Sequence, residues 1–278
     1  MASNILTKAV CHAMQRIAPL RLAASWDNVG LLLESPVQSQ NANGRRVLLT
    51  IDITPAVFDE ALSRDTSMII SYHPPIFAGL KSLTLANPLQ GTLLRCAAAG
   101  ISVYCPHSAL DSVYGGVNDW LVDCIGAEQK NVANLDEKAE TQAIGGDGRR
   151  ATFDPPISME VLEGRIKKNL NLRQIQVGYS PVRPDRLVKT VAICAGSGGS
   201  MFNGKVADVY FTGEMAHHEV LAAVAAGTHV ILCGHTNTER GYLPRLAAKL
   251  RHELNADQAL EDVEVIVSQS DAHPLEFV

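Results

Sequence analysis

The chain has 278 residues, of which 46% are hydrophobic, and it carries a formal net charge of −5 at pH 7. This length suits one large domain or two ordinary ones with a substantial core, and no apolar run reaches the roughly 18–20 residues that a transmembrane helix needs. The slight acidic excess, without a Lys/Arg cluster, argues against direct binding of nucleic acid. We therefore expect neither a membrane protein nor a nucleic-acid-binding protein.

The cysteines indicate a reducing compartment, because none of the six belongs to a C-x-x-C pair and several lie inside apolar runs. We therefore expect a cytoplasmic protein. The mitochondrion is the alternative, because residues 1–26 contain Lys8, Arg16 and Arg21 but no acidic residue, as in a mitochondrial presequence. The same residues have the periodicity of an amphipathic first helix, which we favour.

Apolar periodicity predicts strands alternating with helices along the chain. Before residue 127 the expected elements are helices near 4–18, 55–62, 87–99 and 117–126, and strands near 45–53, 66–73 and 100–105. After residue 150 they are helices near 158–170, 214–227 and 240–255, and strands near 173–179, 187–196, 208–213, 228–234 and 262–268. Such alternation predicts an α/β protein whose sheets are covered on both faces.

The segment 127–150 is polar, has little periodicity and ends near GGDG, which is typical of a linker. We therefore predict an N-terminal α/β lobe over 1–126, a linker over 127–150 and a C-terminal α/β lobe over 151–278. The two lobes look duplicated, because VYCPHSALD in the first aligns with ILCGHTNTE in the second. Both stretches follow a predicted strand, so we infer two related βαβαβ halves about a pseudo-two-fold axis.

Polar side chains follow the predicted strands in three places, at the ends where α/β sheets bind ligands. These groups are Tyr72-His73, His107 with Asp111, and His235 with Glu239. Each could have a structural role: a strand-end histidine, a loop-fixing pair, or a cap beside an exposed acid. The repeated His-x-x-x-acid spacing favours a shared metal site instead, since Zn²⁺, Fe²⁺, Mn²⁺ and Co²⁺ all accept imidazole and carboxylate ligands.

Two other motifs have weaker functional signals. The glycine-rich stretch CAGSGGS at 194–200 can cradle a phosphate through backbone N–H groups, but it lacks the Walker lysine, so a structural turn is favoured. The polar residues Asp27 and Asn28 in SWDNVGLLL either hold a loop or line the cleft between the lobes.

Several of these motifs, in this order, resemble the Nif-three-like family, named from an Ngg-interacting factor of fungi, whose bacterial members are labelled GTP cyclohydrolase I type 2 homologues. The resemblance covers about residues 4–277 and rests on SWDNVGLLL, SYHPPIF, HSALD, TGEMAHHEVLAA, GHTNTERGYL and DAHPLEFV. It implies an α/β/α protein of two similar lobes that assembles as a toroidal hexamer, a trimer of dimers.

The resemblance also implies a two-metal site in the cleft between the lobes, with His73, Asp111, His235 and Glu239 as ligands and His107 beside them. The family's His-His-Pro motif reads Tyr-His-Pro here, because Tyr72 replaces its first histidine. A phenol, with an ordinary pKa near 10, is a poor metal ligand at neutral pH. We therefore expect one metal to bind firmly and a second weakly or not at all.

Two functions are compatible with these residues. The first is metal-assisted hydrolysis of a small phosphorylated or nucleotide-like substrate, with His107 moving a proton and Tyr72 donating a hydrogen bond to a developing oxyanion. The second is a non-enzymatic, metal-binding regulatory or adaptor protein with a transcription-related partner. The sequence does not decide whether the chain is an enzyme.

Overall fold

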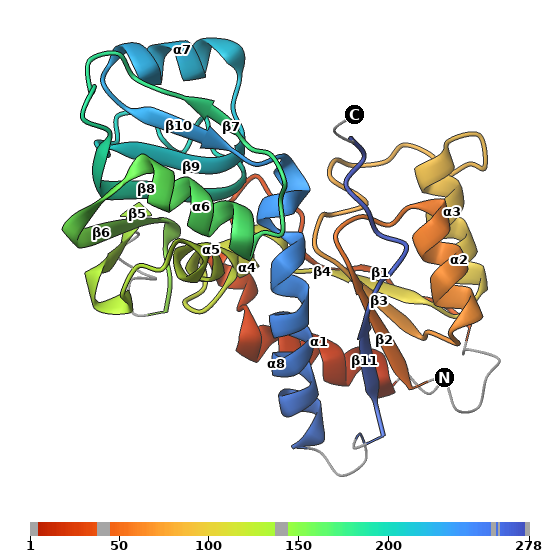
Figure 1. The fold of residues 1–278 in the computed structure, drawn as a ribbon. Coiled ribbons are helices and arrows are strands. Elements are labelled where there is room, and N and C mark those ends of the chain that lie inside the picture. Colours follow the sequence, from red (N-terminus) through yellow and green to blue (C-terminus); the bar gives the residue numbers. More distant parts are fainter. Residues whose placement is uncertain (1–4, 38–44, 137–143, 257–259, 261, 276–278) are drawn as a thin grey trace. The chain divides into compact units, whose positions relative to one another are not determined.

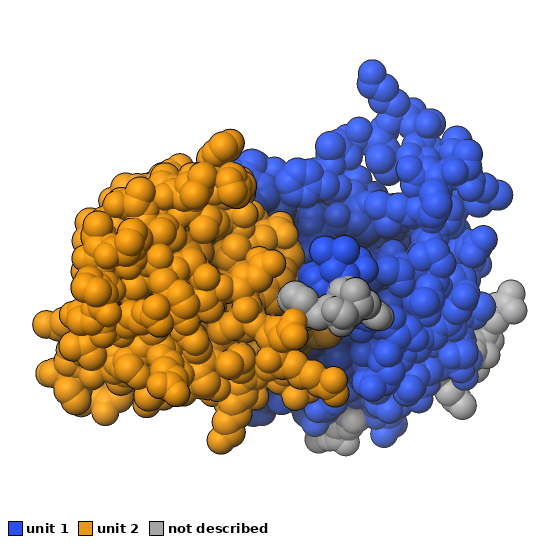
Figure 2. All heavy atoms as spheres, turned by 45° about the horizontal axis from the view of Figure 1, so that its top comes forward, with its two compact units in different colours: residues 1–110, 242–278 blue, residues 111–241 orange. Residues whose placement is uncertain are grey.

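The computed structural model describes residues 5–37, 45–136, 144–256, 260 and 262–275. The chain separates into two compact units, coloured separately in Figure 2. Unit 1 comprises residues 1–110 and 242–278, and unit 2 comprises residues 111–241. Unit 2 is therefore continuous in sequence, whereas unit 1 is built from both ends of the chain.

Unit 1 contains a five-stranded sheet in the order β1-β4-β3-β2-β11 (Figure 1). Its strands are β1 (Gly30–Leu33), β2 (Arg46–Thr50), β3 (Met68–Ser71), β4 (Ser102–Cys105) and β11 (Glu264–Val267). The strands β2, β3, β4 and β11 run parallel, and β1 pairs antiparallel with β4. Parallel strands of this kind are covered on both faces, which explains why nearly every residue of β2, β3 and β4 is buried.

Helices cover both faces of this sheet. The apolar side chains of α2 and α3 pack on the face formed by Leu48, Ile69 and Val103, while α1 and α8 contact each other on the opposite face. Thr54 caps α2 and Asn87 caps α3, each followed by a proline at the first helical position. The helices of this unit are α1 (Ile5–Ile17), η1 (Leu20–Leu22), α2 (Pro55–Ser63), α3 (Pro88–Ala98) and α8 (Leu243–Asn255), and α4 (His107–Ser112) leads into unit 2.

Unit 2 contains a six-stranded sheet in the order β5-β6-β8-β9-β10-β7, with β8, β9 and β10 parallel (Figure 1). Helices α5 and α6 pack on one face, and α7 with Phe202 and Tyr210 forms an apolar cluster on the sheet. Its strands are β5 (Val132–Asp136), β6 (Asp147–Ser158), β7 (Gln176–Gly178), β8 (Leu187–Ser197), β9 (Val209–Glu214) and β10 (His229–Leu232). Its helices are α5 (Val117–Ile125), η2 (Gln129–Asn131), α6 (Met159–Asn169), α7 (His217–Ala225) and η3 (His235–Thr238), and η4 (Arg240–Tyr242) leads back to unit 1.

The predicted α/β class is confirmed, and each unit contains three parallel strands in consecutive order, β2-β3-β4 and β8-β9-β10. The segment 127–150, predicted as a linker, holds β5 and the start of β6; its residues 137–143 lie outside the described part of the chain. The predicted C-terminal lobe ran to residue 278, but β11 pairs with β2 in unit 1. Hydrophobic periodicity identifies a strand without identifying the sheet that it joins.

A buried arginine explains why the start of β6 looked like a linker. Arg149 is fully buried, and its guanidinium donates to both carboxylate oxygens of Asp119 at 2.8 and 2.7 Å. It also donates to the carbonyls of Gly146 and Gly148, at 2.6 and 2.7 Å. A buried charge is tolerated only when it is paired and hydrogen-bonded in this way. The segment is therefore polar in sequence and yet part of the interior.

Candidate metal centre

In unit 1, the site residues Tyr72 and His73 follow β3 directly. Their backbone N–H groups continue the pairing with the neighbouring strand segment, donating to the carbonyls of Thr50 at 2.9 Å and Ile51 at 3.0 Å. The imidazole Nδ1 of His73 lies 3.0 Å from a carboxylate oxygen of Asp52. Strand pairing and this carboxylate thus fix the imidazole at the carboxyl end of the sheet, where α/β proteins bind ligands.

His107, the first residue of α4, is also held by a carboxylate. Its Nδ1 lies 2.9 Å from both carboxylate oxygens of Asp27, and Oδ2 of Asp27 also accepts hydrogen bonds from the backbone N–H and the hydroxyl of Ser108. Burial disfavours ionisation of Asp27, but the hydrogen bonds from His107 and Ser108 outweigh it and lower the pKa of this carboxyl. The backbone of His107 has φ +22°, which an L-residue adopts only when its surroundings hold it there.

Tyr72 and the two histidines of unit 1 form one cluster of rings. The Tyr72 side chain is buried, and its ring centroid lies 5.1 Å from that of His73 and 5.5 Å from that of His107. The two imidazole centroids are 5.5 Å apart. Unit 1 thus brings together three of the predicted site residues.

In unit 2, His235 and Glu239 lie at the two ends of the short helical turn that follows β10. The Nδ1 of His235 lies 2.8 Å from a carboxylate oxygen of Glu214, and its Nε2 lies 3.2 Å from a carboxylate oxygen of Glu239. Glu239 is 2% exposed. The hydrogen bond to Glu239 is the largest cause of a raised His235 pKa, about 9, and burial opposes it. A partly buried imidazole nitrogen and a buried carboxylate oxygen therefore face each other, and both are ligand types that divalent metals accept.

Glycine permits the close packing around these two side chains. Gly196 has φ +63°, and a Cβ built on it would lie 2.6 Å from a Glu239 carboxylate oxygen and 2.9 Å from the His235 Nε2. A Cβ on Gly213 would lie 2.6 Å from the carbonyl oxygen of Gly196 and 2.7 Å from the Cα of His235. The glycine-rich stretch 194–200 therefore packs against the candidate ligands, which supports its reading as a structural turn.

Asp111 belongs to the same part of unit 2. The thiol of Cys194 has a raised pKa, mainly because it is buried and further because the carboxylates of Asp111, Glu239 and Asp147 lie close to it. All three carboxylates act on the same partly buried thiol, so the predicted ligands Asp111 and Glu239 share the surroundings of Cys194.

One arrangement recurs in all three histidines. In each, Nδ1 lies against a carboxylate: Asp52 for His73, Asp27 for His107 and Glu214 for His235. A carboxylate on one imidazole nitrogen fixes the ring and its tautomer so that the other nitrogen can bind a metal or accept a proton. Asp52 and Glu214 were not among the predicted site residues. Each lies at or just beyond the carboxyl end of a parallel strand, and that position in the sequence could have identified them as candidates.

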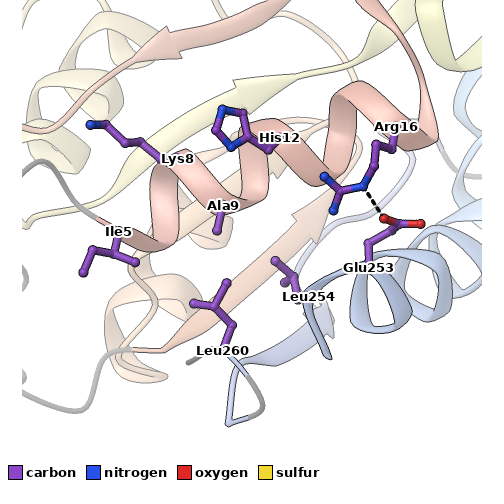
Figure 3. Close-up of a pocket in the computed structure, with 8 residues that line it drawn as sticks. All are labelled: Ile5, Lys8, Ala9, His12, Arg16, Glu253, Leu254 and Leu260. Atoms are coloured by element: carbon purple, nitrogen blue, oxygen red, sulfur yellow. Dashed lines mark hydrogen bonds and ion pairs between the residues drawn. The ribbon is translucent and has the colours of Figure 1, made fainter. Parts of the chain in front are cut away.

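A separate hollow of about 290 Å³ lies in unit 1 between α1 and α8 (Figure 3). Its floor is apolar, with Ala9, Leu254 and Leu260, and its rim carries Arg16 bound to Glu253 at 2.5 Å. It contains none of the predicted site residues. Among the described residues, no helix is long and apolar enough to cross a bilayer.

Comparison with known proteins agrees with this architecture. The model of the family described as Duf34/NIF3 (NGG1p interacting factor 3) matches residues 5–274. The Schizosaccharomyces pombe protein NIF3 homolog is 45% identical over 98% of both chains. The Saccharomyces cerevisiae NGG1-interacting factor 3 is 40% identical over 98% of this chain and 99% of its own.

Two solved structures have the same fold. A Bacillus cereus protein related to NIF3 has a TM-score of 0.83 at 20% identity, covering 98% of this chain and 99% of its own. Reduced HcgD from Methanocaldococcus jannaschii has a TM-score of 0.73 at 22% identity, covering 95% of this chain and 97% of its own. Fold, family match and relatives agree, and the chain belongs to the Duf34/NIF3 family.

Proposed function

We propose that this chain is a metal-dependent hydrolase of a small phosphorylated or nucleotide-like substrate. His73, Asp111, His235 and Glu239 would hold a divalent ion, Zn²⁺, Fe²⁺, Mn²⁺ or Co²⁺, all of which accept nitrogen and oxygen ligands. The observation that carries the proposal is the carboxylate held against Nδ1 of every candidate histidine. Such carboxylates orient metal-binding and proton-transferring imidazoles in metalloenzymes.

The chemistry divides between the ion and the protein. A bound divalent metal lowers the pKa of water towards neutrality and polarises a substrate oxygen. Asp27 would accept a hydrogen bond from the Nδ1–H of His107, which leaves the Nε2 of that ring free to take a proton from the nucleophile. The Tyr72 hydroxyl would donate a hydrogen bond to negative charge that develops on the substrate.

A panel of phosphate esters and nucleotides, offered to protein purified without chelator, tests this function. We expect turnover by the wild-type chain and its loss in both Asp111→Ala and Glu239→Ala, with the oligomer unchanged in light scattering. Lys168→Ala, at an exposed position of α6, is the control and should retain activity. Turnover that survives in both carboxylate variants would contradict the proposal.

An adaptor role is the second candidate, favoured by the name of the Saccharomyces cerevisiae relative, NGG1-interacting factor 3. In that case the metal site would support assembly or sense metal, in the cytoplasm or the mitochondrion. The expected results are no turnover across the panel and binding of a transcription-related partner that Asp111→Ala and Glu239→Ala leave unchanged.

We also propose that the chain forms a homo-oligomer, a hexamer built as a trimer of dimers. Leu80, Leu83 and Leu85, between β3 and α3, are 43%, 48% and 74% exposed. Apolar side chains gathered on one connection are typical of a surface that another chain covers. Light scattering of the wild-type chain should give six times the monomer mass, and Leu83→Asp with Leu85→Asp should lower it.

Replacing Tyr72 with histidine should add a second firmly bound metal. The wild-type chain should retain about one equivalent after desalting, and Tyr72→His about two, because an imidazole replaces a phenol that is a poor ligand at neutral pH. Tyr72→Phe keeps the ring without the hydroxyl and should stay at one equivalent. Plasma emission measures the content, and two equivalents in the wild-type chain would contradict the prediction.

Metal affinity should rise with pH because of His235. Its pKa of about 9 means that the ring is protonated at neutral pH in the metal-free chain, and a metal must displace that proton. Affinity should therefore increase about tenfold per pH unit between pH 7 and 9. Calorimetric titration with Zn²⁺ at several pH values measures this slope.

The same proton stabilises the metal-free fold. The folded pKa lies above the ordinary value of 6.5, so the contribution of His235 is fully present below about pH 6.5 and is lost as pH rises through 9. Denaturant unfolding of metal-free protein should show this decline, and His235→Gln should remove it. His217→Gln, at an exposed position on α7, should leave the decline unchanged. An equal decline in His235→Gln would assign it to another group.

A further inference from the structure

Unit 1 exposes two aromatic side chains side by side. Trp26 is 62% exposed and Phe77 is 58% exposed, and their ring centroids lie 6.0 Å apart with a tilt of 42° between the planes. Large aromatic side chains contribute most when they are covered, so a pair left open to solvent indicates a surface that binds something.

Hydrogen bonds fix the backbone beside each of these rings. The Asn28 side chain donates to the carbonyl of Ile76, the residue before Phe77. Asp27, the residue after Trp26, accepts hydrogen bonds from Ser108 and lies against His107. The two aromatic residues come from segments 51 positions apart, yet these bonds hold them together, so little entropy remains to be lost when a ligand covers them.

The aromatic pair is continuous with the histidines of unit 1. The Trp26 centroid lies 6.0 Å from that of His107, with the rings nearly perpendicular at 75°, and the His107 centroid lies 5.5 Å from that of His73. A ligand held against Trp26 and Phe77 would therefore extend, within a few ångströms, to the imidazoles assigned to catalysis and metal binding. This continuity favours a small ligand that has a flat end and a reactive end.

We propose that Trp26 and Phe77 bind the planar aromatic ring of the substrate and direct its phosphorylated end towards His107 and His73. The substrate class is then a nucleotide or a similarly built aromatic phosphate. The placement of the phosphorylated end rests on the proposed hydrolase function. Stacking on Trp and Phe tolerates every nucleobase, because each base offers a π-face. The aromatic pair therefore selects for a ring without naming the base.

The test uses metal-free, full-length protein, so that ring binding is measured apart from metal binding and turnover. Adenosine 5′-monophosphate is compared with ribose 5-phosphate, which lacks only the base. Trp26 is exposed, whereas Trp120 is only 6% exposed, so iodide quenches mainly the fluorescence of Trp26. A ligand that covers Trp26 should therefore reduce this quenching. We expect shielding by AMP and none by ribose 5-phosphate.

Calorimetry then measures AMP affinity in variants. Trp26→Ala and Phe77→Ala should each weaken binding about tenfold or more, the scale of one lost base stack. Trp26→Phe keeps a ring and should bind AMP nearly as well as the wild-type chain. Leu62→Ala, an equally exposed apolar position on α2, is the matched control and should not change the affinity.

Three results would overturn the proposal: AMP affinity in both alanine variants equal to that of the wild-type chain, binding of ribose 5-phosphate as tight as that of AMP, or disruption of the oligomer by Trp26→Ala with AMP affinity kept. The last would assign the pair to a protein interface. Failure of the hydrolase function is distinguishable, because the wild-type chain would then give no turnover while its AMP binding still depended on Trp26 and Phe77. Phe77→Ala, at an exposed loop position, keeps the test informative if Trp26→Ala does not fold.

Discussion

The substitution Glu239→Gln is expected to lower metal affinity by more than about 100-fold. Replacing a group that only supports a ligand typically costs 10- to 100-fold, and Glu239 is proposed to be a ligand itself. The amide that replaces it is neutral and binds divalent metals poorly, and the side chain is 2% exposed, so water compensates little. Metal content after desalting and calorimetric titration with Zn²⁺ measure the loss.

Two further glutamates make this expectation specific. Glu214→Gln keeps both proposed ligands but removes the carboxylate 2.8 Å from His235. Its metal affinity should therefore fall by an intermediate amount, about 10- to 100-fold. Glu264→Gln, at an exposed position of β11, should retain wild-type affinity. An undiminished metal content in Glu239→Gln, or a greater loss in Glu214→Gln, would remove Glu239 from the ligand set.

Gly196→Ala is expected to disturb the His235–Glu239 pair and to weaken metal binding. The new methyl group would lie 2.6 Å from the Glu239 carboxylate and 2.9 Å from the His235 ring, distances that real Cβ atoms do not adopt. The side chains or the turn must move, and metal affinity should fall by at least about 10-fold because ligand positions matter within fractions of an ångström. Calorimetric titration with Zn²⁺ measures the affinity.

Gly204→Ala supplies a matched control for this glycine. Gly204 has φ +72°, close to the +63° of Gly196, but a Cβ there has no atom within 4 Å. Both variants lose about 1–2 kcal/mol of unfolding free energy to the left-handed backbone, while only Gly196→Ala adds the contact with the ligands. Equal metal affinities in the two variants would show that the turn accommodates the methyl group.

The sequence predicted most helices and the parallel strands because each depends on local pattern, whereas β1, β5 and β6 were not predicted. The cap at Thr54 with Pro55 behind it marks the start of α2, and the apolar run after Arg46 marks β2. The repeated His-x-x-x-acid spacing likewise identified His235 and Glu239, which the structure places 3.2 Å apart. Spacing within one turn is a local property, so the sequence alone can predict it.

Contacts between residues of neighbouring strands could not be predicted in this way. Asp52 follows β2 and contacts His73 after β3, while Glu214 ends β9 and contacts His235 after β10. Each pair forms only because two parallel strands lie side by side, which is a property of the sheet. Arg149 was misplaced for the same reason. A charged residue is expected at the surface, and only the fold shows that Arg149 is buried against Asp119.

The C-terminal strand β11 has a consequence for biosynthesis. Unit 1 draws α8 and β11 from residues 242–278, so a nascent chain emerging from the ribosome lacks the strand beside β2 and the helix that packs on α1. Until these residues have emerged, the edge of β2 offers unpaired backbone groups and the α1 face keeps apolar side chains uncovered. Unit 2 is continuous over 111–241, so its folding does not depend on residues from the end of the chain. The middle of the chain can therefore complete its fold before the beginning does, and a stop codon after residue 241 would leave the first lobe, rather than the last, dependent on chaperones.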